Sequence, residues 1–119
     1  MRRALLLLTL TSALHGAEVS AYCHCARCNG KAGQPTASGR MPVDGISIAA
    51  PRRVPLGTWV RLQGPGIDMV RRVDDRLSPR FDHRWDLFTN SHSGALRWGV
   101  KKLKITVLPG PPKRRAINP

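Results

Sequence analysis

The sequence predicts a mainly β fold: a small six-stranded barrel with one short helix. Two observations lead to this class. Six short segments have the alternating apolar pattern or the β-branched content of strands. Turns rich in glycine and proline separate these segments at close intervals. Many short strands joined by tight turns are typical of a small barrel, and 119 residues hold one domain.

The predicted strands can be placed in order along the chain. The first (EVSAY) alternates and runs into a cysteine-rich segment, and Gly64-Pro65-Gly66 makes a tight turn between the third and fourth. In the fifth, a period of two puts Trp85 and Leu87 on one side and Asp86 and Phe88 on the other. The six strands are expected at 18–22, 45–50, 58–62, 67–73, 84–88 and 104–108.

One short helix is predicted at 90–98, before the last strand. Asn90 or Ser91 is a suitable N-cap, and Gly99 is placed to end the helix. A helix this short is unstable alone, so it must pack against the sheet. Its apolar face is expected to contain Ala95, Leu96 and Trp98.

The two ends of the chain differ from the middle. Basic residues at 2–3 precede a short apolar run at 4–14, which is the pattern of a secretory signal and is too short to span a bilayer. We expect cleavage after Ala17, with cleavage after Ala21 or a retained anchor as alternatives. The chain then divides into a signal peptide (1–17), the barrel domain (18–108) and a basic, proline-rich disordered tail (109–119).

The protein is strongly basic, with a formal net charge of +13 at pH 7. Such a balance predicts attraction to polyanions. For an exported monomer in the periplasm, outer membrane or cell wall, these are anionic envelope polymers, and no nucleic acid partner is expected. The basic groups that would serve nonspecific binding are Lys101, Lys102, Lys104 and the run 113–115, and the favoured alternative is a solvated basic face with no dedicated site.

Three cysteines lie close together in the segment CHCARC: Cys23, Cys25 and Cys28. Cysteines outside the cytoplasm commonly form disulfides, and Cys25 and Cys28 have the CxxC spacing that closes a small disulfide loop. Free thiols, intermolecular pairing, and a metal site completed by His24 or another histidine are the alternatives. Because no second CxxC occurs, we predict the disulfide, with no metal and no cofactor.

Carboxylates gather in one short segment, 73–88, which holds four of the seven acidic residues. Neighbouring carboxylates raise one another's pKa and neighbouring arginines lower it, which is the balance a general acid or base requires. The alternative is a polar loop whose carboxylates cap turns or pair with Arg76, Arg80 and Arg84. The four carboxylates belong to Asp74, Asp75, Asp82 and Asp86.

Four motifs occur in one order along 18–108: AYC at 21–23, TASG at 36–39, VPLGT at 54–58, and Asp75 to Asp86 followed by Leu87-Phe88. In this combination the chain resembles the 3D domain family, named for three aspartates. The resemblance implies a double-psi β-barrel, similar to the barrel of MltA-type lytic transglycosylases and, more distantly, to RlpA-like and expansin barrels.

Two positions depart from the family pattern. Many relatives carry an aspartate where this chain has Ala50, so the third aspartate is missing or is replaced by Asp74 or Asp82. The glycine-rich turn that usually follows the first loop aspartate is here the bulkier, basic segment 76–82 (RLSPRFD).

The resemblance also implies a function and a set of site residues. The function is cleavage of the glycosidic bond in peptidoglycan, with Asp86 as the catalytic acid and Asp75 as its supporting carboxylate. The alternative is a non-catalytic module that binds cell-wall glycan, with Trp59 or Trp85 stacking on sugars. The residues expected to bind substrate are Thr36, Ser38, Arg76, Arg84 and Ser91.

Overall fold

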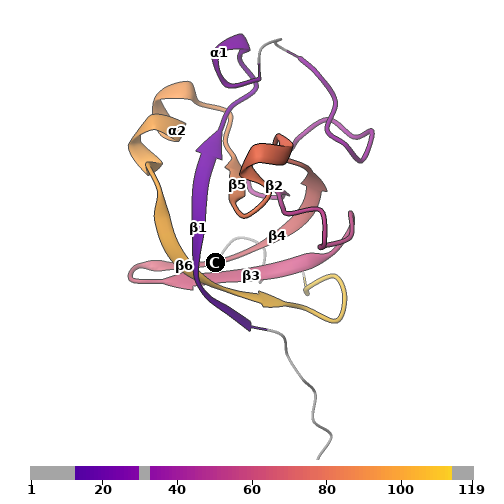
Figure 1. Cartoon of the computed structure of the whole chain (residues 1–119), viewed down its shortest axis with the longest axis vertical. Helices are drawn as coiled ribbons and strands as arrows, with labels where there is room; N and C mark the ends of the chain where they lie inside the picture. The colour runs from indigo at the N-terminus through magenta and orange to yellow at the C-terminus, as the bar shows by residue number, and fades with distance from the viewer. Residues whose placement is uncertain (1–12, 30–32, 114–119) are drawn as a thin grey trace, which may run out of the picture.

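A computed structural model describes residues 13–29 and 33–113 (Figure 1). The strands are β1 (Ala13–Tyr22), β2 (Ser47–Ala49), β3 (Trp59–Gly64), β4 (Ile67–Asp75), β5 (Trp85–Phe88) and β6 (Lys101–Val107). They pair edge to edge in the order β1-β5-β2-β4-β3-β6, and the ring closes between β6 and β1. The predicted mainly β fold with a six-stranded barrel is therefore confirmed.

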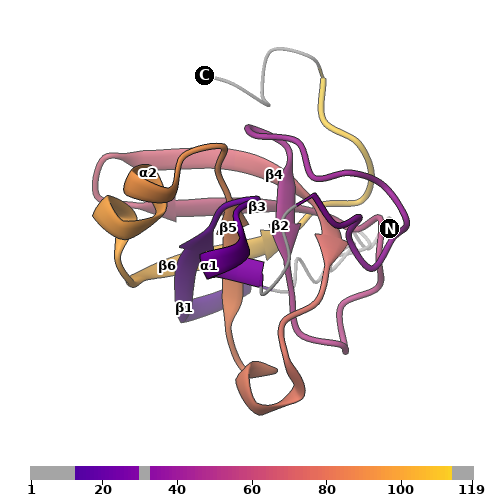
Figure 2. The ribbon, with the colours of Figure 1, turned by 90° about the horizontal axis from the view of Figure 1, so that it is seen from above.

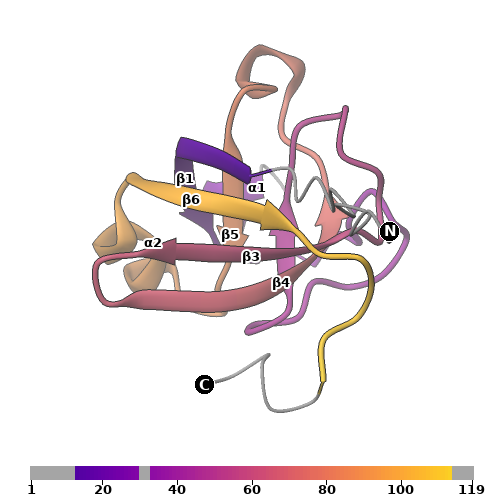
Figure 3. The same cartoon turned by 90° about the horizontal axis from the view of Figure 1, so that it is seen from below.

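Most neighbours in the ring are antiparallel, but two pairs are parallel: β1 with β5, and β2 with β4. Parallel neighbours cannot be joined by a hairpin, so they bring together segments that are distant in sequence. In the first pair, Ser20 lies beside Asp86 and Tyr22 beside Phe88. On the opposite side of the barrel, β3, β4 and β6 form an antiparallel sheet (Figure 3).

Three short helical segments accompany the strands: α1 (Ala26–Asn29), the 3-10 turn η1 (Pro79–Phe81) and α2 (His92–Trp98). The predicted helix is α2, with Ser91 as its N-cap: the Ser91 hydroxyl accepts a hydrogen bond from Gly94 N. Gly99 ends it at φ +67°, a left-handed value that favours glycine. The single turns α1 and η1 were not predicted, and the segment carrying η1 projects from the barrel (Figure 2).

Strand boundaries differ from prediction mainly at the N-terminus. β1 begins at Ala13, so the predicted junction between signal peptide and barrel at 17–18 falls inside this strand. Ala17 is buried in the core and pairs with Leu103 of β6. Residues 1–12 and 114–119, which hold the rest of the predicted signal peptide and tail, lie outside the described residues.

The barrel is filled by aliphatic side chains and one tryptophan. Trp85 and Leu87 point into it, as the alternation in β5 predicts, and leave Asp86 on the other face. One core prediction is wrong: Leu96 is 69 % exposed, because α2 turns Ala95 and Trp98 toward the barrel instead. The buried core consists of Ala17, Val19, Ile48, Ala50, Val54, Val60, Leu62, Val73, Trp85, Leu87, Leu103 and Ile105.

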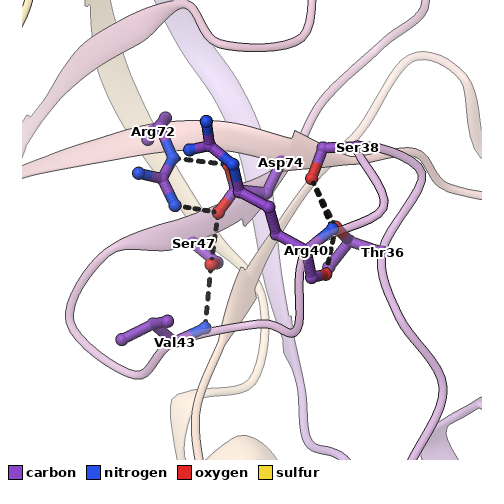
Figure 4. Close-up of polar contacts among 7 residues, drawn as sticks. All are labelled: Thr36, Ser38, Arg40, Val43, Ser47, Arg72 and Asp74. Carbon is purple, nitrogen blue, oxygen red and sulfur yellow. Dashed lines mark hydrogen bonds and ion pairs between the residues drawn. The ribbon is translucent and has the colours of Figure 1, made fainter.

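Asp74 is a charged residue inside the fold, only 1 % exposed (Figure 4). Its carboxylate accepts hydrogen bonds from Ser47 Oγ at 2.6 Å and from Arg72 Nε and Nη2 at 2.6 and 3.0 Å. It therefore pairs with an arginine, but with Arg72 rather than with those of the acidic segment. Because Ser47 lies in β2 and Asp74 in β4, this network joins the two strands.

Among the described residues, no helix has the length and apolar character needed to cross a lipid bilayer.

We predict that Asp74→Ala lowers the free energy of unfolding by about 3 kcal/mol, because it leaves the Arg72 guanidinium and the Ser47 hydroxyl without their buried acceptor. Urea unfolding at pH 7 measures the change. The matched control is Asp68→Ala, which breaks the exposed ion pair between Asp68 and Arg61 (2.7 Å) and should change stability little. Equal losses in the two variants would contradict the prediction.

Candidate active site

A cleft of about 430 Å³ opens on the outer face of the barrel, where β1, β4 and β5 meet the segment that follows β4. Two carboxylates, two arginines, two hydroxyls of serine, a phenol and two apolar side chains surround it. The lining residues are Ser20, Tyr22, Asp75, Arg76, Leu77, Ser78, Phe81, Arg84 and Asp86.

Asp86 is held by the strands on both sides of it. It pairs with Ser20 of β1 and with Ala49 of β2, and Ser20 Oγ donates a hydrogen bond to its Oδ1 at 3.0 Å. Burial raises the pKa of the Asp86 carboxyl from 3.8 to about 6, although the Ser20 hydrogen bond and the Arg84 charge lower it; the Asp75 charge adds to the increase. At pH 6 this carboxyl therefore exists in both protonated and ionised forms.

Asp75 reaches the same cleft from β4 because of an irregularity in strand pairing. Ile48 of β2 pairs with Val73, but Ala49 pairs with Asp75, so Asp74 is an extra residue in β4 at this point. In regular alternation Asp75 would share the inward direction of Val73. The bulge turns it outward, as β-bulges near functional sites often do, and Ala49 is left between Asp75 and Asp86.

Donors from three directions hold the Asp75 carboxylate. Tyr22 Oη donates to Oδ2 at 3.1 Å, while the backbone N–H groups of Ala37 and Arg76 donate to Oδ1 at 3.0 and 2.8 Å. Burial and the neighbouring Asp75 charge raise the pKa of the Tyr22 phenol, which keeps it protonated and able to donate. Asp75 is thus fixed as an acceptor, and in the described part of the chain its bonds do not extend to Asp86.

Each arginine of the cleft is partly engaged elsewhere. Arg76 Nη2 donates to the Val54 carbonyl at 2.6 Å, which ties the segment after β4 to the turn before β3. Arg84 Nε donates to Glu18 Oε2 at 3.0 Å across the β1–β5 edge. Both residues line the cleft, so anionic groups of a ligand in it would lie near two guanidinium groups.

Four of the seven predicted catalytic and binding residues line the cleft: Asp75, Asp86, Arg76 and Arg84. The other three, Thr36, Ser38 and Ser91, are not among its lining residues. Thr36 is buried, and its hydroxyl bonds to Ser38 Oγ and to the Arg40 carbonyl, both at 2.7 Å, in the turn that supplies the Ala37 N–H (Figure 4). Ser91 caps α2.

No third aspartate lines the cleft among the described residues. Ala50 is fully buried in the core. Asp74 is enclosed in its own network with Arg72, and Asp82 accepts from the Arg52 backbone N–H at 2.9 Å. Neither lies in the cleft as a third aspartate, so the described cleft contains one carboxyl with a raised pKa and one carboxylate held by three donors.

Sequence reasoning did not select five lining residues: Ser20, Tyr22, Leu77, Ser78 and Phe81. Ser20 and Tyr22 had a usable signal, because they share one face of a predicted strand. Their relevance depends on that strand lying beside Asp86, which nothing in the local sequence specifies. The other three belong to the segment 76–82, whose sequence departs from the family pattern.

Cys23 and Cys25 are not among the residues that line the cleft. Cys23 and Cys25 are gathered with His92, in an arrangement that could hold a metal ion, at the end of β1. The predicted Cys25–Cys28 disulfide stays a prediction, because the Cys28 side chain lies outside the described residues.

We predict that Asp86→Asn raises the free energy of unfolding at pH 7.5 by up to about 3 kcal/mol, since the wild-type carboxyl must ionise in a buried position. The folded protein holds the Asp86 proton more tightly than the unfolded chain, so wild-type stability falls as pH rises from about 4 through 6. The advantage of the variant should therefore vanish near pH 4. Urea unfolding at both pH values measures it, with Asp82→Asn as the control; an advantage independent of pH would contradict the assignment.

No family model and no curated protein matches the chain, so membership of the 3D domain family stays a prediction. Among solved structures, the fold is similar to MltA from Escherichia coli, described as having a unique lytic transglycosylase fold: TM-score 0.50, 20 % identity, 68 % of this chain and 29 % of that one. A second structure of MltA from E. coli gives a TM-score of 0.49 and 19 % identity over 67 % and 28 % of the two chains. The chain thus shares the fold of a barrel in MltA and spans less than a third of that protein's length.

Proposed function

We propose that this protein is an exported enzyme that cleaves the glycan strand of peptidoglycan in the manner of a lytic transglycosylase. One observation carries the proposal: Asp86 is a buried carboxyl with a pKa of about 6 that faces an open polar cleft. A general acid works best when its pKa lies near the working pH. The similarity of the barrel to that of MltA supports the choice of peptidoglycan as substrate.

The proposed reaction needs one carboxyl group rather than the pair that most glycoside hydrolases use. Protonated Asp86 gives its proton to the glycosidic oxygen between N-acetylmuramic acid and N-acetylglucosamine, and the bond from that oxygen to muramic C1 breaks. The resulting Asp86 carboxylate takes the proton of the muramic C6 hydroxyl, whose oxygen bonds to C1. The products are a 1,6-anhydromuramic end and a free N-acetylglucosamine end, and Asp86 is protonated again.

Asp75 supports this cycle through its charge. It stays fixed by Tyr22, Ala37 and Arg76, so its negative charge remains close to Asp86 throughout. That charge raises the pKa of Asp86 and favours the protonated form that starts the reaction. It also stabilises the positive charge that develops on the sugar ring as the bond breaks.

Arg76 and Arg84 are proposed to bind carboxylates of the substrate. Peptidoglycan carries carboxylates on its lactyl and peptide groups, and guanidinium groups bind carboxylates with paired hydrogen bonds. Arg84 also opposes the raised pKa of Asp86. Engagement of Arg84 by a substrate carboxylate would weaken that opposition, so binding would strengthen the tendency of Asp86 to hold its proton.

We predict that purified protein releases anhydro-muropeptides from peptidoglycan and that Asp86→Asn lowers the rate by about 100- to 10,000-fold, the usual contribution of a general acid. Mass analysis of the soluble fragments measures the products. The control is Asp68→Asn, which alters an exposed carboxylate on β4 at its ion pair with Arg61 and should keep full activity. Products with ordinary reducing ends would mean hydrolysis, and no release by folded protein would count against an enzyme.

A second function, a non-catalytic module that binds cell-wall glycan, is favoured by the buried Ala50 at the position where the family carries an aspartate. Trp85 cannot stack on a sugar, because it is 2 % exposed in the core. Trp59, half-buried beneath the Arg72 guanidinium at 5.8 Å, is the better candidate.

If the protein is a binding module, we predict that the double variant Asp75→Asn, Asp86→Asn is still retained on intact sacculi. The wild type should then release no fragments from them. Nonspecific attraction through Lys102 and Lys104, both exposed on β6, would instead weaken steeply with salt. Pull-downs at low and high salt separate the two cases. Loss of retention in the double variant at both salt concentrations would contradict the binding-module function.

A further inference from the structure

Two sulfur atoms and one ring nitrogen converge at one end of the barrel, apart from the cleft. Cys23 Sγ lies 2.9 Å from Cys25 Sγ, and His92 Nδ1 lies 3.5 Å from Cys23 Sγ and 3.2 Å from Cys25 Sγ. The three atoms are all within 4.8 Å of one another. Cys23 is 1 % exposed and the other two residues are half-buried, so the ligand atoms meet in a partly enclosed place.

The barrel topology assembles this group from residues 67 positions apart. Parallel strands β1 and β5 end together, with Tyr22 beside Phe88, and the Thr89 N–H donates to the Tyr22 carbonyl at 2.9 Å. Cys23 directly follows β1. In the segment that follows β5, Ser91 caps α2, which begins at His92. Helices α1 and α2 therefore lie at the same end of the barrel (Figure 1).

The donor set and its spacing fit zinc. Thiolate sulfur and imidazole nitrogen are zinc ligands at about 2.3 and 2.0–2.1 Å, and tetrahedral angles then put sulfur about 3.6 Å from nitrogen and about 3.8 Å from a second sulfur. The two sulfur–nitrogen distances, 3.5 and 3.2 Å, are close to that arrangement. The sulfur–sulfur distance, 2.9 Å, would have to widen by about 0.9 Å.

We propose that Cys23, Cys25 and His92 bind one zinc ion. The structure places all three ligand atoms together. Zinc in proteins is usually tetrahedral, so a fourth ligand completes the site. Binding releases the thiol protons to solvent.

Histidine participation distinguishes this proposal from a disulfide. A disulfide would use two of the three cysteines and would give the His92 ring no role, whereas His92 Nδ1 lies near both sulfurs. His24, the histidine inside the cysteine segment, is turned away: its Nε2 lies 3.2 Å from the Gln34 carbonyl. The ligand from outside the segment is therefore His92.

Zinc at this position would stabilise the end of β1 against α2. Trp98 Nε1 already donates to the Val19 carbonyl at 2.9 Å, so the metal would add a second attachment at the opposite end of the helix. The site would also adjoin the cleft in sequence, because Tyr22, the residue before Cys23, donates a hydrogen bond to Asp75. The zinc proposal rests on the ligand geometry, and it does not require the protein to be an enzyme.

The test uses the full chain, purified with a reductant and titrated with zinc chloride in competition with a chromophoric chelator. We expect one zinc per chain and a higher melting temperature with zinc than without. Cobalt chloride should give the absorption of a tetrahedral thiolate complex. His92→Ala, Cys23→Ser and Cys25→Ser should each weaken zinc binding by at least about 100-fold. His92→Cys, which restores a zinc ligand, and the control His24→Ala should retain it.

Three results would overturn the proposal: no zinc retained by folded, reduced wild type; unchanged affinity in His92→Ala; or a disulfide, seen as the loss of two hydrogens in the intact mass, in protein made with zinc available. Circular dichroism checks that each variant is folded. The cobalt spectrum of the wild type tests the thiolate ligands even if a variant fails to fold.

Discussion

The parallel pairing of β1 with β5 is the constraint on which the rest of this structure depends. It places Ser20 against Asp86, so that the carboxyl with the raised pKa has a hydrogen-bond donor beside it. It also makes the two strands end together, which brings the cysteine segment to the start of α2. One backbone ladder therefore determines both the cleft and the cysteine–histidine group.

Two adjacent aspartates in β4 show how local geometry decides what a carboxylate does. Asp74 turns to Ser47 and Arg72, where paired charges and full burial make it part of the framework. Asp75, one residue later, faces the cleft, because the β2–β4 register shifts between Ile48 and Ala49. A change of one residue in that register would exchange the two environments.

Although the protein is strongly basic, its cleft contains a carboxyl group, that of Asp86, whose pKa is raised. Arg84 lowers the pKa of Asp86, yet burial outweighs this pull and the pKa reaches about 6. Arg84 also forms an ion pair with Glu18, with 3.0 Å between Nε and Oε2. Arg84 thus acts on the Asp86 carboxyl through its charge. Among the described residues, Asp86 has no close ion pair of the kind that joins Asp74 to Arg72.

The fold class, the approximate strands and the capped helix α2 could be predicted from the sequence, because alternation, caps and turns are local properties. Local patterns indicated only a cluster of four carboxylates, and the resemblance to the 3D domain family selected Asp75 and Asp86 among them. Tertiary structure decided the rest: which face Asp75 takes, that Ser20 and Tyr22 belong to the cleft, that Thr36, Ser38 and Ser91 do not line it, and that His92 joins the cysteines. These outcomes depend on strand register and on parallel neighbours more than sixty residues apart, which local patterns do not encode.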